Sequence, residues 1–181
     1  QIFTPRLETV QRVGASTLGV DSIETQDIGV TEDLDADGLG ELVVLGHEPT
    51  ADTVLLLSSR DGSVLQRIPA ELGSLVGGSV AAVGELLVVG APAVADGAGR
   101  VYLYSLASAE VIAVLGEESS PGDGFGASVL ARRTESGTTA IFAGAPGAAT
   151  AAGAQAGIVR AFDGQGQSLA TFEGPIAGAR L

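Results

Sequence analysis

Short apolar runs separated by glycine-rich turns recur along this chain. One set of four runs occupies residues 78–82, 85–92, 99–104 and 110–114. A similar set begins at Gly126, and a more divergent set begins at Ile28. The runs are short, rich in Val, Leu, Ile, Tyr and Phe, and bounded by Gly, Pro, Asp and Ser, which is typical of β-strands. The pattern therefore predicts twelve short strands in three copies of one unit.

The repeat predicts an all-β fold built from propeller blades. The second runs end at Gly46, Gly90 and Gly144, so the copies follow one another at intervals of 44 and 54 residues. Four antiparallel strands that recur at such intervals are the unit of a β-propeller. The second run of each copy is almost continuously apolar, which indicates burial on both faces. Because one blade cannot bury both of its faces alone, we expect neighbouring blades to stack on each other.

We expect three four-stranded antiparallel blades, at residues 27–70, 73–115 and 122–173. Residues 1–26, with a strand-like segment at 7–12, would supply the terminal strand of a neighbouring blade or a linker. Residues 174–181 would begin a further blade or form a tail. The chain begins with Gln rather than Met, so we also expect it to be a processed or excised segment of a longer precursor.

Paired glycine motifs in each copy resemble a known repeat. Phe125-Gly126 followed by Gly144-Ala145-Pro146 is similar to the FG-GAP repeat of integrin α propellers. The other copies contain related motifs at Gly77-Gly78, Gly90-Ala91-Pro92, Ile28-Gly29 and, in weakened form, Gly46-His47-Glu48-Pro49. The resemblance implies an extracellular, calcium-binding propeller that binds protein or glycan partners. Propellers of that family close with about seven blades, whereas this chain provides three.

An acidic loop links the first two runs of the first copy. Residues 33–41 are Asp-Leu-Asp-Ala-Asp-Gly-Leu-Gly-Glu, which places carboxylates at alternate positions around a turn that Gly38 permits. Ca²⁺ binds six to eight oxygens at about 2.3–2.6 Å, and such a loop directs its oxygens to one point. The ligands that we expect are the side chains of Asp33, Asp35 and Asp37, the backbone carbonyl of Leu39 and the carboxylate of Glu41.

Two other structures could contain such a loop. An EF-hand needs Glu at the twelfth position, which is Val44 here, and a helix after the loop rather than a strand. A solvated acidic turn without a metal is the simpler alternative. The resemblance favours calcium, although the ninth position of the FG-GAP loop is usually Asp and here is Glu41. The other two copies lack the acidic residues at this loop, so we expect one calcium site.

Composition limits the classes of partner. Nine basic residues, all of them Arg, and 22 acidic residues give a net charge of −13. This charge repels nucleic acid and attracts divalent cations or basic surfaces, although it could also serve only to keep the protein in solution. No apolar run approaches the roughly 20 residues of a membrane span. Cys and Asn are absent, which excludes disulfides and N-linked glycans. The Ala, Gly and Arg content suggests a bacterial source.

The sequence offers few catalytic groups, and we expect the protein not to be an enzyme. His47 is the single histidine, and Cys and Lys are absent, so most nucleophilic mechanisms lack their residues. A pair of carboxylates acting on glycosides stays possible, because acidic residues are plentiful. We expect Tyr102, Tyr104, Phe142 and Phe162 to pack between blades. Four arginines are expected to solvate outer edges: Arg60, Arg67, Arg100 and Arg160.

The sequence and the resemblance together predict a secreted or cell-surface adhesion module. It would bind a protein or glycan through its loop-bearing face without catalysing a reaction. A structural subunit of a self-assembling surface layer or filament is the alternative, and a propeller-based hydrolase is the third. Because an incomplete ring leaves blade faces open, the chain would be part of a larger propeller or associate with copies of itself.

Overall fold

The chain forms three antiparallel sheets of four strands each. The structure, a computed structural model, describes residues 13–70 and 78–174. Blade 1 contains β1 (Ser22–Val30), β2 (Leu42–His47), β3 (Asp52–Leu57) and β4 (Val64–Ala70). Blade 2 contains β5 (Val80–Val83), β6 (Leu86–Ala91), β7 (Arg100–Ser105) and β8 (Val111–Leu115). Blade 3 contains β9 (Ser128–Arg133), β10 (Thr139–Ala145), β11 (Ile158–Asp163) and β12 (Ser168–Glu173). The predicted all-β fold of three four-stranded blades is confirmed.

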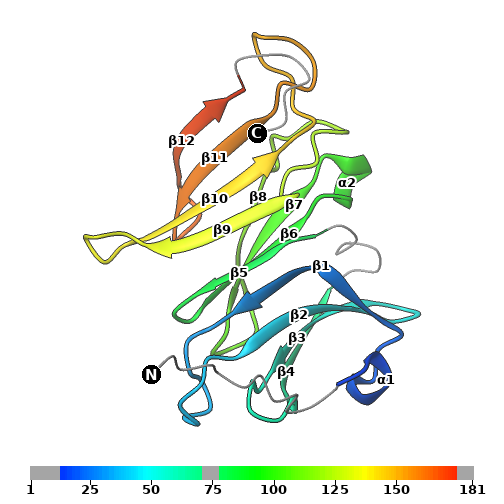
Figure 1. Cartoon of the computed structure of the whole chain (residues 1–181). Coiled ribbons are helices and arrows are strands. Elements are labelled where there is room, and N and C mark those ends of the chain that lie inside the picture. The colour runs from blue at the N-terminus through cyan, green and yellow to red at the C-terminus, as the bar shows by residue number, and fades with distance from the viewer. Residues whose placement is uncertain (1–12, 71–77, 175–181) are drawn as a thin grey trace, which may run out of the picture.

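The blades fan out from their first strands. Figure 1 shows β1, β5 and β9 near the centre of the molecule, with blade 2 between blades 1 and 3. In each sheet the strands follow in chain order from this centre to the outer edge. Asp27 ties two first strands together, because its Oδ2 accepts a hydrogen bond of 2.8 Å from the amide of Val80. The strand order and the fan are those of part of a β-propeller.

Apolar side chains fill the two spaces between blades. Between blades 1 and 2, Val43 and Leu45 share a buried cluster with Leu87 and Val89. Between blades 2 and 3, the buried cluster includes Val88, Leu103, Phe125, Ile141 and Phe162. Burial of each such side chain contributes about 1.5–3 kcal/mol, so both layers stabilise the contact between neighbouring blades. As predicted, the second strands β2 and β6 are buried on both faces.

Phe125 is the largest side chain that is fully buried, and it lies between blades 2 and 3. Its ring meets that of Phe162 edge to face at 6.2 Å, and the Arg160 guanidinium lies 5.3 Å from its centroid. The backbone of Phe125 approaches Gly99 so closely that a Cβ on Gly99 would lie 2.1 Å from the Phe125 carbonyl oxygen. Glycine is therefore required at residue 99, where φ is +82°.

Each blade carries a β-bulge at the same place. The pairing of the third strand with the fourth skips one residue, which is Leu65 in blade 1, Ile112 in blade 2 and Leu169 in blade 3. All three are apolar and exposed, at 39%, 51% and 61%. A bulge twists and bends an outer strand, and edge strands often use bulges to avoid pairing with another sheet. The repeated bulge marks equivalent positions in the three blades.

The bulges correct the alignment of the first copy by one residue. On the third strand of each blade, the residue just before the bulge pairs with one residue of the second strand. These pairs are Leu56 with Val43, Leu103 with Val88 and Ala161 with Phe142. Val43 is therefore equivalent to Val88, and the predicted match of Gly46 with Gly90 is wrong, because Leu45 occupies that position. A shift of one residue exchanges the two faces of a strand. Since β2 is apolar on both faces, the sequence pattern alone did not determine the register.

The residues before blade 1 cover its outer face. Leu18, in the one-turn helix α1 (Ala15–Leu18), and Val20 are buried in a cluster with Val44 and Leu55. β1 begins at Ser22, earlier than the expected blade boundary at residue 27. The expected strand at residues 7–12 and the expected further strand at the C-terminus, beyond residue 174, lie outside the described residues.

The second helical segment, α2 (Val94–Gly97), is a short turn with left-handed residues inside it. Among the residues that the structure describes, no helix is long and apolar enough to cross a membrane.

Two expectations about individual side chains need correction. Phe142 does not belong to the cluster between blades 2 and 3, because it lies on the opposite, open face of blade 3. The four arginines do more than solvate edges, since each bonds a neighbouring segment: Arg60 to Asp37, Arg67 to the carbonyl of Leu18, Arg100 to the carbonyl of Gly116 and Arg160 to Glu118. Their planar guanidinium groups link segments that the hydrophobic pattern does not connect.

We predict that Phe125→Ala lowers the free energy of unfolding by about 3–5 kcal/mol, because it leaves a cavity between two blades. The matched control is Phe172→Ala on the outer strand, where the ring is 54% exposed and the loss should be about 1 kcal/mol or less. Urea denaturation measures both. Equal losses in the two variants would contradict the assignment of Phe125 as the wedge between blades.

Candidate metal centre

Three aspartates converge in the loop between β1 and β2. Asp33, Asp35 and Asp37 each offer one carboxylate oxygen, and these oxygens lie within 4.8 Å of one another. Two oxygens that bind one Ca²⁺ at about 2.3–2.6 Å are at most about 5 Å apart, so the spacing suits a shared ion. In the described part of the chain this is the one cluster of three or more metal-type ligands.

Backbone amides of the loop hold the carboxylates in place. Asp33 accepts hydrogen bonds from the amides of Asp37, at 3.2 Å, and Gly38, at 2.9 Å. Asp37 accepts one from the amide of Leu39 at 2.8 Å. Gly38 has φ of +91°, as the predicted tight turn requires. Ala36 has φ of +62°, a left-handed conformation that costs a non-glycine residue about 1–2 kcal/mol. Convergence of the carboxylates thus depends on a strained turn.

Glu41 lies fully buried behind the loop. Its Oε1 accepts hydrogen bonds from the amides of Leu34, at 2.7 Å, and Asp35, at 3.3 Å. Its Oε2 is buried and has no hydrogen-bond partner in the described part of the chain. The corrected alignment makes Glu41 equivalent to Leu86, a leucine of the interblade core. A carboxylate in the position of a leucine is costly unless a positive charge lies close by.

Arg60, in the turn between β3 and β4, reaches the same loop. Its Nε donates to Asp37 Oδ2 at 2.8 Å, and its Nη2 donates to the carbonyl of Asp37. The pKa of the Arg60 guanidinium is raised, chiefly by the hydrogen bond to the Asp37 side chain and next by the negative charge of Asp37. The hydrophobic pattern does not predict this contact. The signal was available, because in a four-stranded meander the first and third turns lie at the same end of the blade.

The structure brings together three of the five predicted ligands. Leu39 is 46% exposed, and Glu41 braces the loop from behind rather than joining the cluster of three aspartates. Their roles as ligands stay predictions. The donor set consists of hard oxygens without thiolate or imidazole, which fits Ca²⁺ rather than a softer metal. A nearby cation would also compensate the negative charge at the unpartnered Oε2 of Glu41.

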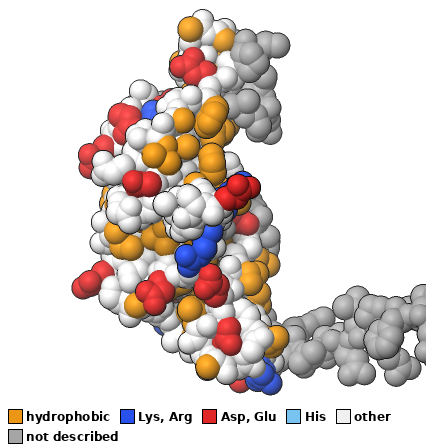
Figure 2. Space-filling view, turned by 90° about the vertical axis from the view of Figure 1, so that its left-hand side faces the viewer, with side chains coloured by type: hydrophobic (Ala, Val, Ile, Leu, Met, Phe, Trp, Pro, Cys, Tyr) orange, Lys and Arg blue, Asp and Glu red, His pale blue; other side chains and the backbone are white. Residues whose placement is uncertain are grey.

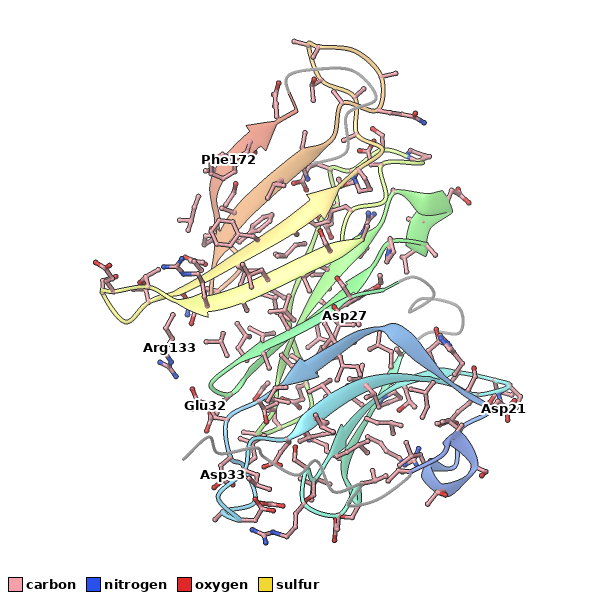
Figure 3. The ribbon with its side chains drawn as sticks, viewed as in Figure 1. Asp21, Asp27, Glu32, Asp33, Arg133 and Phe172 are labelled. Carbon is pink, nitrogen blue, oxygen red and sulfur yellow. The ribbon has the colours of Figure 1, made fainter. Side chains whose placement is uncertain are left out.

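A salt bridge connects the start of the loop to blade 3. Arg133 Nη2 at the end of β9 lies 3.8 Å from Glu32 Oε1, and Figure 3 shows the two side chains pointing toward one another across the space between blades. Asp33, the next residue and the first of the acidic loop, lies below Glu32 in the same view. Both side chains of the bridge are more than half exposed, so we expect it to orient the loop rather than to add much stability.

His47 lies at the other end of the blade from the acidic loop. It is the last residue of β2, and its Nδ1 is 2.9 Å from Oδ1 of Asp52, which is almost fully buried. The pair joins directly opposite residues of the hairpin β2–β3. This arrangement locks the end of the hairpin, as a cross-strand pair does.

A comparison with solved structures supports the fold. No protein-family model matches the sequence, and a comparison with curated proteins finds no match. Among solved structures, the chain resembles the quinohemoprotein alcohol dehydrogenase ADHIIG from Pseudomonas putida HK5, with a TM-score of 0.50 and 16% identity. The match covers 80% of this chain and 20% of that one, so this chain spans about a fifth of that protein. At this identity the likeness shows the β-propeller fold alone.

We predict that calcium raises the melting temperature of the wild type. A ligand that binds only the folded state, at about 100 times its Kd, contributes about 2.7 kcal/mol, or about 5–10 °C for a domain of this size. Asp35→Asn keeps the shape of the loop but removes a charge, and should abolish most of this shift. Glu41→Gln should also reduce the shift. With a chelator present, however, Glu41→Gln should be at least as stable as the wild type, because it removes a buried, unpaired charge.

Calorimetry with calcium and with EDTA measures these shifts. Glu173→Gln on the outer strand β12 is the matched control and should respond to calcium as the wild type does. If calcium raises the melting temperature of wild type and Asp35→Asn by the same amount, this loop is not the binding site.

Proposed function

We propose that the chain is a calcium-binding module of a β-propeller, related to the FG-GAP type, that binds a protein or glycan partner and catalyses no reaction. The observation that supports this function best is the cluster of three aspartate oxygens beside the buried, unpartnered oxygen of Glu41. A structural ion would compensate these charges and fix the strained loop. The loop would then form part of a defined surface for a partner on a secreted or cell-surface protein.

The distribution of polar groups supports a binding role over a catalytic one. The single histidine is engaged with Asp52 at the opposite end of blade 1, away from the acidic cluster. Figure 2 shows the end of the molecule that bears the acidic loop, with acidic and apolar side chains interspersed over the face and basic side chains near its middle. Such mixed surfaces suit partners with both apolar and charged groups.

The proposed function predicts calcium-dependent capture of a partner. The immobilised chain is presented to a glycan array and to purified extracellular proteins, in excess calcium and in EDTA. We expect EDTA or Asp35→Asn to weaken binding at least about tenfold, as is common when one site orders another. Glu173→Gln should bind as the wild type does. A partner bound equally well in EDTA would contradict the role of the metal, and a turnover that Asp35→Asn abolishes would contradict a non-catalytic module.

Self-association is the second candidate, and one face of blade 3 favours it. Leu130 pairs with Phe142, and Val159 with Phe172, so these side chains share the face opposite the interblade cluster. Leu130 and Phe172 are each 54% exposed. The outer face of blade 1 is instead covered by the segment that contains Leu18. The described part of the chain thus has one open apolar face. If two copies joined through this same face of blade 3, the contact would be symmetric and would close at a dimer.

We predict that the double variant Leu130→Asp, Phe172→Asp is monomeric at concentrations at which the wild type forms dimers, because two charges per copy would be buried in the contact. The control is Leu169→Asp on the opposite face of β12, which should leave the dimer intact. Sedimentation velocity over a range of concentrations measures both. A wild type that stays monomeric excludes the pair, and a wild type that polymerises indicates a second contact face.

A further inference from the structure

A groove of about 380 Å³ lies between blades 1 and 2, beside the acidic loop. Its floor includes Leu56 of β3 and Leu106 of the β7–β8 turn, which are 6% and 7% exposed. Leu34 of the acidic loop and Leu65 of β4 stand at its sides, 40% and 39% exposed. The volume is at the lower end of the range of small-ligand pockets, so it suits one side chain or a small group.

The charged groups of this groove are all acidic. Asp35 lines it from the loop and Glu85 lines it from the β5–β6 turn, and no basic residue is among its lining residues. One Ca²⁺ bound to the three aspartates would leave a net charge of about −1 on the cluster. Glu85 lies outside that cluster and keeps its own charge. Arg60, bonded to Asp37, offsets this remaining charge. With the metal bound, the uncompensated charge among the lining residues of the groove is therefore that of Glu85, in a chain whose net charge is −13.

An apolar floor with carboxylates at the rim is chemically complementary to a side chain that has an apolar stem and a cationic end. Arginine and lysine lay their aliphatic stems on apolar surface while the cationic end stays near water. A ligand without charge would leave Glu85 unused, and an anion would be repelled by Asp35 and Glu85. Arginine in particular is enriched at protein interfaces.

The groove and the metal loop share a wall. The amides of Leu34 and Asp35 both donate to Oε1 of Glu41, so the residues that line the groove are fixed by the same carboxylate that lies behind the aspartate cluster. An ion that orders the loop would order this wall too. By linkage, a ligand in the groove would in turn tighten the binding of calcium.

We propose that this groove binds an arginine or lysine side chain of a partner protein, with the stem on Leu56 and Leu106 and the cationic end at Glu85. The proposal rests on the proposed binding function and names the chemistry of the partner. Binding strengthens when calcium occupies the adjacent loop.

The probe for this site is the peptide acetyl-Gly-Gly-Arg-Gly-Gly-amide, titrated into the calcium-loaded chain with ¹³C-labelled leucine methyl groups. We expect a dissociation constant on the order of 1 mM, since the anchor is small, with shifts at Leu34, Leu65 and Leu106. The same peptide with citrulline has the shape of arginine without its charge and should bind at least about fivefold more weakly. A peptide with glutamate should not bind.

Glu85→Gln should weaken the arginine peptide about fivefold, whereas Glu117→Gln, at the opposite end of blade 2, should have no effect. Equal binding of the arginine and citrulline peptides, equal binding by Glu85→Gln, or no shift at the three leucines would overturn the proposal.

The melting temperature of the same samples, with and without calcium, separates this proposal from the metal site. A calcium shift without peptide binding would reject the groove and retain the metal centre. Peptide binding without a calcium shift would reject the metal centre and retain the groove as a calcium-independent site.

Discussion

Face-to-face packing of thin sheets is the interaction on which this structure depends. Each four-stranded sheet is apolar on both faces, so it is stable only where a neighbour covers it. Blade 2 is covered on both sides, and blade 1 is covered by blade 2 and by the segment of Leu18 and Val20. Small side chains bring the sheets close, and Phe125 fills the space that they leave. In the ranges that the structure describes, nothing covers the face of blade 3 that carries Leu130 and Phe172.

The acidic loop is built into this packing rather than attached to it. Glu41 occupies the core position that Leu86 occupies in blade 2, and it holds the loop through the amides of Leu34 and Asp35. Outside the core, Arg60 reaches the loop from the β3–β4 turn, and Arg133 reaches its start from the end of β9. A divalent ion at the three aspartates would therefore act on the loop, on the interface between blades 1 and 2 and on the adjacent groove at once.

Much of the candidate site could be predicted from the sequence, because its aspartates are close together in the chain. Alternating aspartates around Gly38 require only a tight local turn, and the structure contains that turn. The burial of Glu41 could not be predicted in this way, since it depends on which face of β2 meets blade 2. The contacts of Arg60 and Arg133 join residues far apart in sequence, and hydrophobic patterning carries no information about such pairs.

By itself, the sequence determined the number of blades, the four strands in each and the convergence of the aspartates, because these depend on short-range periodicity and turn chemistry. Only the tertiary structure decided the register of blade 1, in which Val43 rather than Val44 is equivalent to Val88. A strand that is apolar on both faces can pack through either one, and a shift of one residue changes its pattern little. The choice between the faces was made by the neighbouring sheets, whose shape the linear sequence does not display.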